Sequence, residues 1–162
     1  MPPKGQSPAD TIISDFSAFE SLFSRGYTVS PDVIVFKDKE TDLDLVAKFR
    51  TLTPVELRDI FEEVSKFTSP VGQTVTEQLE TLARAVVTLN GSPLAMSKAE
   101  VDDFYANYNR YPTPLEAARY VMQEKIRSVI IIDALFGKYV EFAEEIVKSF
   151  DDIKKNSEMT DS

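Results

Sequence analysis

The last third of the chain carries an apolar stripe with the spacing of one helix face. From the start of this stripe the apolar positions advance by alternating steps of three and four residues: Val129, Ile132, Phe136, Tyr139, Ala143, Ile146, Phe150 and Ile153. This is the spacing of a seam that keeps a helix against a partner. Ile131, Leu135 and Phe142 lie beside the seam and widen it. The pattern therefore predicts a long helix whose apolar face needs to be covered.

A shorter helical pattern stands near the beginning of the chain. Between residues 9 and 24 the apolar positions recur at helical spacing: Ile12, Phe16, Phe19 and Phe23. Gly26 follows, and glycine just beyond a helix commonly ends it. Residues 1–8 consist largely of Pro, Ser, Gly and Lys, so they are predicted to form a flexible arm.

The apolar period changes to two over residues 32–50. Val33–Phe36 is a β-branched and aromatic run, and Lys39–Asp42 is polar and turn-like. In the stretch that follows, alternate residues share one apolar face: Leu43, Leu45, Ala47 and Phe49. Such a pattern predicts a β-hairpin with one buried face. Because two strands alone are only marginally stable, helices are expected to cover that face.

Four capping boxes predict where the helices after residue 50 begin. They are Thr53–Glu56, Thr74–Glu77, Ser97–Glu100 and Thr113–Glu116, and each stands just before an amphipathic run. In such a box the hydroxyl accepts a bond from the amide three residues on, and the glutamate side chain reaches back to the cap.

The ends of these helices are predicted from glycine and proline. The apolar face of the second helix continues to Leu89, where Asn90-Gly91 is expected to end it. The third ends at Tyr111-Pro112, because the residue before proline avoids the helical region. The fourth has no such stop before about Lys155.

The predicted fold is therefore mainly α with a small β-hairpin, an α+β class in which a helical domain ends in a long C-terminal helix. Four segments are expected: a flexible arm at 1–8, a helical domain at 9–112 with the hairpin at 32–50, the long helix at 113–155, and a flexible tail at 156–162.

The predicted C-terminal helix is too long for a compact domain of this size. About 40 residues at about 1.5 Å each would span about 60 Å, whereas a domain of this length is about 40 Å across. Either the helix breaks, with Gly137 as the obvious place, or it protrudes and buries its stripe against another chain. The partner of the stripe is then this chain, a second copy of it, or a client protein.

Composition narrows the partners further. The 162 residues carry a net charge of −9, which disfavours binding to nucleic acid because phosphate contacts normally need Lys or Arg. No apolar run approaches the length of a membrane span, and the N-terminus lacks the apolar core of a secretion signal. The chain has no Cys and therefore no disulfide, which suits a reducing cytoplasm. A protein partner in the cytoplasm is the expectation that remains.

No catalytic, cofactor or metal site is predicted. The absence of His removes the commonest general base and metal ligand. Asp42 and Asp44 could approach a cation, but no further ligands follow at loop spacing, so they are interpreted as solvated turn acids. Tyr105, Tyr108 and Tyr111 either stack on a base or peptide, or pack on one helix face. Because no nucleophile stands with a candidate base, an enzyme is not expected.

Three stretches together resemble the tail assembly chaperones of long-tailed bacteriophages. The first is the second hairpin strand leading into a helix start, LVAKFRTLTPVEL at residues 45–57. The second is LETLARAVVTLNGSPL at residues 79–94, a helix that ends in Leu-Asn-Gly. The third is the long C-terminal helix, with Tyr139 inside it and Lys148-Ser149 near its end. The resemblance covers about residues 32–150.

The resemblance implies a non-enzymatic protein of the infected host cytoplasm that binds the tape measure protein while the tail tube polymerises. A structural virion component, such as a baseplate or neck subunit, is the alternative. For helix-on-helix recognition of the client, the stripe offers the expected contact residues: Ile131, Leu135, Phe136, Phe142 and Ile146.

Overall fold

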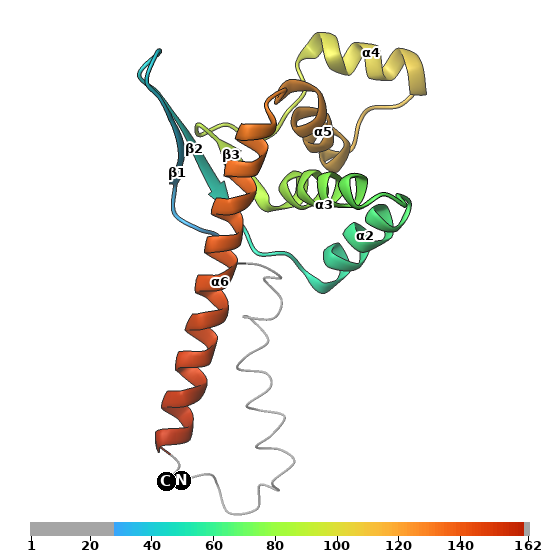
Figure 1. The fold of residues 1–162 in the computed structure, drawn as a ribbon. Helices are drawn as coiled ribbons and strands as arrows, with labels where there is room; N and C mark the ends of the chain where they lie inside the picture. The colour runs from blue at the N-terminus through green and yellow to red at the C-terminus, as the bar shows by residue number, and fades with distance from the viewer. Residues whose placement is uncertain (1–27, 161–162) are drawn as a thin grey trace, which may run out of the picture.

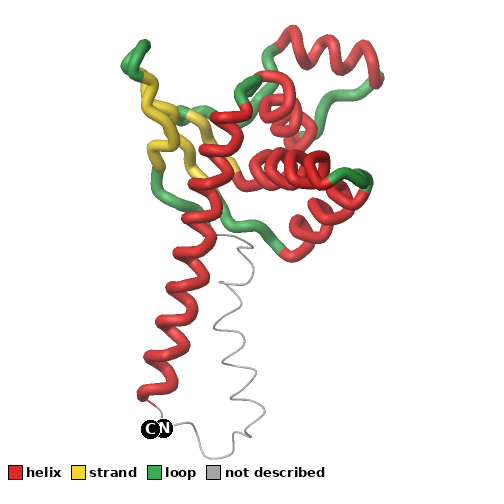
Figure 2. Tube along the Cα trace, in the orientation of Figure 1, coloured by secondary structure: helices red, strands yellow, loops and turns green. Residues whose placement is uncertain are grey.

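The structure is a computed structural model that describes the backbone of residues 28–160 and their side chains, except those of residues 150, 153, 154 and 156–160. Figures 1 and 2 show a small sheet on one side of a long helix and a group of helices on the other. The elements in chain order are β1 (Val33–Asp38), β2 (Leu43–Phe49), α2 (Pro54–Ser65), α3 (Pro70–Ala85), β3 (Val86–Leu89), α4 (Lys98–Tyr108), α5 (Pro114–Tyr120), the π-helical turn η1 (Val121–Lys125) and α6 (Val129–Thr160). The predicted α+β class is confirmed.

The sheet is antiparallel with the order β1-β2-β3, and the predicted hairpin forms its first two strands. Val33 pairs with Ala47 at one end of the hairpin, and Asp38 pairs with Leu43 at the other. Ala47 and Phe49 point to the covered face and are fully buried. Helix α6 packs against β1 and β2, so it supplies the cover that two strands need.

The third strand departs from the prediction of a helix through Leu89. Helix α3 ends at Ala85, and Val86 takes an extended conformation with φ −77° and ψ 116°. The β-branched run that follows pairs with β2, and pairing with an existing strand outweighs helix propensity there. Asn90 and Gly91, with φ of 48° and 79°, then turn the chain after the strand rather than after a helix.

Three of the four predicted capping boxes are confirmed. The side chains of Thr53, Ser97 and Thr113 each accept a hydrogen bond from the backbone amide three residues on. In each case the glutamate at that position accepts a hydrogen bond from the backbone amide of the cap residue. The fourth is wrong, because Thr74 lies inside α3 and its hydroxyl donates to the carbonyl of Pro70. The helix begins earlier with Ser69 as its cap and Pro70 at the first position, and the Ser69 hydroxyl accepts from the Gly72 amide.

The prediction of a single helix at 113–155 is also wrong, because residues 126–128 are not helical and separate two helical segments. The Ile126 amide donates to the Val121 carbonyl, five residues back, which closes a π-helical turn. Ile126 is then extended, and the Ser128 hydroxyl accepts from the Ile131 amide at the start of α6. Gly137 lies inside α6 and does not break it.

The structure tests the prediction for the C-terminal end of the chain but not the one for the N-terminal end. The backbone stays helical through Thr160, so the flexible tail predicted for 156–162 is wrong up to that residue. The arm at 1–8 and the helix at 9–24 lie outside the described residues.

The core joins the sheet, α3, α5, η1 and the first half of α6. Its buried members are Ala47, Phe49, Leu82, Ala83, Val86, Ala118, Met122, Ile132, Leu135 and Phe142. At 32 residues, α6 is about 48 Å long. Its C-terminal part therefore projects beyond the other described elements, as Figure 1 shows.

Gly137 offers a test of this helix. An added Cβ would meet nothing within 4 Å, and the residue lies in a helix interior, where glycine is less favourable than alanine. We expect Gly137→Ala to raise the free energy of unfolding in urea by about 0.5–1 kcal/mol. Gly91→Ala is the control and should lower it, because Gly91 has a φ of 79°. A destabilised Gly137→Ala would contradict a continuous α6.

Candidate protein-binding surfaces

The structure turns most of the predicted contact face of α6 toward the chain's own core. Leu135 is fully buried and Phe142 is 8% exposed, so the prediction that these two side chains contact a partner is wrong. Ile131, Phe136 and Ile146 are half-buried and pack against the core. The seam periodicity identifies a covered face correctly, but it does not distinguish α3 and the sheet of the same chain from another protein.

Part of the surface of α6 is only partly covered, and we call it the α6 strip; it adds Val140 and Val147 to the seam residues Tyr139 and Ala143. It consists of Tyr139, Val140, Ala143 and Val147, which together with Glu144 line a shallow groove. Val147 is 61% exposed. The Tyr139 ring lies 6.2 Å from that of Phe49, so the strip begins at the core and runs out along the projecting part of the helix.

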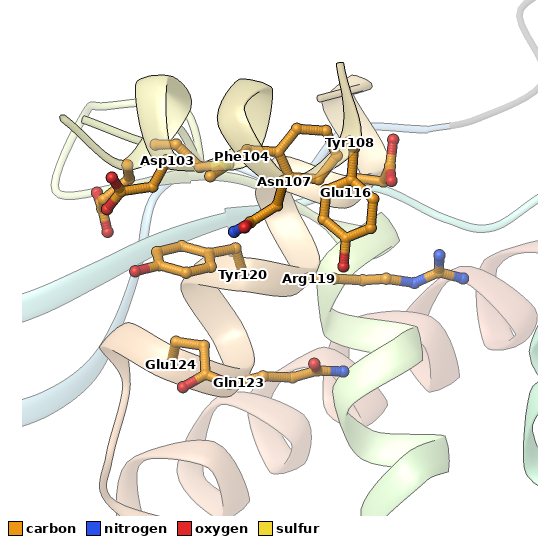
Figure 3. Close-up of a pocket in the computed structure, with 11 residues that line it drawn as sticks. Asp103, Phe104, Asn107, Tyr108, Glu116, Arg119, Tyr120, Gln123 and Glu124 are labelled. Carbon is orange, nitrogen blue, oxygen red and sulfur yellow. The ribbon is translucent and has the colours of Figure 1, made fainter. Parts of the chain in front are cut away.

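A second concave surface lies between α4 and the α5–η1 segment, and we call it the α4 cleft (Figure 3). It encloses about 460 Å³. Its walls combine aromatic, amide and charged side chains: Met96, Glu100, Asp103, Phe104, Asn107, Tyr108, Glu116, Arg119, Tyr120, Gln123 and Glu124. Helix α4 itself has no buried residue, so it stands away from the core (Figure 1).

Two ion pairs hold the ends of α4. At its start, Glu100 accepts from the Ser97 amide and lies 2.7 Å from the Lys125 ammonium. The bond from Lys125, followed by that from the Ser97 amide, lowers the pKa of Glu100 to about 2. The capping glutamate of α4 thus also anchors the helix to η1.

An ion pair with a capping glutamate also holds the other end of α4. Just after the helix, Arg110 binds Glu116 through two hydrogen bonds of 2.7 and 2.8 Å. The Arg110 bond, followed by the Thr113 amide, lowers the pKa of Glu116 to about 2. Both carboxylates are therefore ionised at neutral pH, and the middle of α4 is left free to form one wall of the cleft.

The tyrosines singled out in the sequence lie on the surface around α4. Tyr108 and Tyr111 are exposed, and the Tyr111 ring lies 5.0 Å from that of Tyr105. The Arg110 guanidinium lies 5.1 Å from the Phe104 ring centre, a cation–π arrangement. These rings therefore contact one another and Arg110, and none belongs to the core.

A buried ion-pair network, which the sequence did not single out, joins α3 to α5. The Glu80 carboxylate binds the guanidinium of Arg84 at 2.5 Å and the Nε of Arg119 at 3.0 Å. The Glu80 and Arg84 side chains are only 6% and 5% exposed. Their spacing of four residues is that of an ordinary surface pair. Only the tertiary structure reveals that this pair is buried and that Arg119 completes it.

The described residues thus form two surfaces that a ligand could contact, the α6 strip and the α4 cleft. Among the side chains that the structure describes, no group of three or more His, Cys, Asp or Glu residues that could hold a metal ion occurs. Asp42 is exposed in the hairpin turn, as interpreted from the sequence, whereas Asp44 is exposed within β2, where it pairs with Lys37. Within residues 28–160 no helix is both long and apolar enough to span a membrane. Comparison with protein-family models, curated proteins and solved structures finds no match.

Proposed function

We propose that this protein is a non-enzymatic tail assembly chaperone of a long-tailed bacteriophage, which binds the tape measure protein in the host cytoplasm. The observation that carries the proposal is the α6 strip, an apolar face on a helix that projects beyond the core. The resemblance of residues 32–150 to such chaperones supplies the identity of the client.

The strip suits a helical client. Val140, Ala143 and Val147 are three and four residues apart, so their side chains form one row that a second helix can follow. Because Val140 is already half-buried and Val147 is 61% exposed, covering what remains of both valines contributes about 1–3 kcal/mol before the costs of association. A contact of this size is readily reversible, as a chaperone needs when the tail tube replaces it on the client.

The test is co-purification of the tape measure protein with the full chain after co-expression. We expect the double variant Val140→Asn, Val147→Asp to capture at least about tenfold less client, since a loss of 1.4 kcal/mol already has that effect. Thermal unfolding should stay cooperative, because Val140 is half-buried and Val147 is exposed.

A matched control uses two other exposed apolar residues of α6. Val129→Asn, Ile130→Asp changes side chains that are 75% and 72% exposed but lie at the opposite end of the helix. Capture should be unchanged in this variant. Equal loss in both variants, or none in either, would count against the strip as the client surface. Stoichiometric amounts of the chain in purified particles would instead favour a baseplate or neck subunit.

A further inference from the structure

The α4 cleft is an open volume that the chain's own packing does not fill. Because α4 buries no residue, the ion pairs Glu100–Lys125 and Arg110–Glu116 hold it over α5 and η1 by its ends. The space between them, about 460 Å³, lies within the range of sites for small ligands or single side chains. The question is therefore which chemistry its walls favour.

One end of the cleft carries negative charge without a matching cation. Asp103 of α4 and Glu124 of η1 lie on the same side of the cleft as the Tyr120 hydroxyl (Figure 3). Neither carboxylate forms an ion pair with another residue of the described range, whereas Glu100 beside them is neutralised by Lys125. The pKa of Tyr120 is raised by its bond to Glu100, by burial, and by the charges of Glu100, Glu124 and Asp103.

The aromatic walls add a second requirement. Phe104, Tyr108 and Tyr120 present ring surfaces to the cleft, which can cover the apolar stem of a long side chain. A hydrated metal ion would leave these rings unused. A ligand that combines a flat cationic group with an apolar stem uses both the rings and the carboxylates.

The chain itself supplies an independent example of such a group at the opposite end of the cleft. Arg110 lies over the rings of Phe104 and Tyr108, at 5.1 and 6.0 Å from their centres. The same guanidinium forms two hydrogen bonds with Glu116. Rings and a carboxylate of this cleft thus already hold one guanidinium, while Asp103 and Glu124 beside Tyr120 hold none in the described structure.

We propose that the α4 cleft binds an arginine side chain presented by a partner protein, with the guanidinium between Asp103 and Glu124 and its stem against Phe104 and Tyr120. Arginine fits better than lysine because its planar fork binds carboxylates bidentately and stacks on rings. Helix α4, which forms one wall of the cleft, lies at the other end of the molecule from the projecting part of α6 (Figure 1). The cleft is therefore a second docking point, separate from the α6 strip.

The experiment titrates the full chain, labelled for NMR, with the peptide acetyl-Gly-Ser-Arg-Ser-Gly-amide. The same peptide with citrulline in place of arginine is the comparison, because citrulline keeps the shape and loses the charge. We expect the arginine peptide to shift the amides of Asp103, Tyr120 and Glu124 in a saturable way. Removing both charges with Asp103→Asn, Glu124→Gln should weaken binding by about tenfold or more, because the guanidinium then loses both of its carboxylate partners.

The matched control removes the same two charges outside the cleft. Asp102→Asn, Glu145→Gln alters exposed carboxylates on α4 and α6, neither of which lines the α4 cleft or the α6 strip, and should leave the affinity within about twofold. Three results would overturn the proposal: equal binding of the citrulline peptide, equal weakening by the control variant, or no saturable shift in the cleft of the unaltered chain. Thermal unfolding of both variants shows whether they keep their fold.

Discussion

Replacing Glu80 with alanine is expected to lower the free energy of unfolding by about 3–5 kcal/mol, because it leaves buried charge without a partner. Arg84, whose side chain is 5% exposed, loses its carboxylate, and Arg119 loses both of its bonds to Glu80. Urea denaturation followed by circular dichroism measures the change. A loss of this size is a large part of the stability of a domain.

Glu77→Ala is the matched control on the same helix. Glu77 is exposed and forms no ion pair with another described residue, so its removal should change stability by less than about 0.5 kcal/mol. If Glu80→Ala behaved like Glu77→Ala, the network would be open to water, and α3 and α5 would be held together by apolar contacts alone.

Leu135→Ala is expected to cost about 2–5 kcal/mol of folding free energy, because it removes a fully buried side chain and leaves a cavity. The leucine sits among the buried residues of the sheet, α3 and η1. Denaturant unfolding of the isolated protein measures this effect without any client present. The same experiment separates a core role from a contact role, since a contact residue would barely affect the free chain.

Val147→Ala serves as the counterpart on the α6 strip. Because Val147 is 61% exposed, stability should change by less than about 0.5 kcal/mol, while capture of the client weakens. A stable Leu135→Ala combined with a destabilised Val147→Ala would reverse the assignment of the two faces of α6.

Local chemistry accounts for the parts of the fold that were predicted correctly. The hairpin follows from alternation along residues 32–50, and the starts of α2, α4 and α5 follow from a hydroxyl and a glutamate three residues apart. In each of these cases the residues that determine the element lie within it or next to it.

The wrong predictions concern helix and strand boundaries that depend on residues distant in the sequence. Thr74 resembles a helix cap, but Ser69-Pro70 already starts the same helix. Val86–Leu89 continues the helical pattern of α3, yet β2 is available to pair with it. The break at residues 126–128 has neither glycine nor proline, so no local breaker marks it, and Gly137, the break point in one of the two predicted alternatives, lies inside α6.

The binding surfaces show the same division. The apolar stripe predicts correctly that one face of α6 is covered. The residues that cover Leu135 and Phe142, however, belong to the core of the same chain. The α6 strip shares Tyr139 and Ala143 with that stripe and adds Val140 and Val147, which the seam spacing does not mark. The α4 cleft joins residues from α4, α5 and η1, whose spatial relation depends on two ion pairs between separate elements.

Helix α3 passes into β3 at Ala85–Val86 with no intervening loop, and α6 lies across both layers by packing on α3, β1 and β2. A pull on the far end of α6 is therefore shared between the sheet and the helices, and no flexible joint between α3 and β3 can yield first. The projecting helix is therefore fixed to both the sheet and α3. A client bound near its end would transmit force to both layers together.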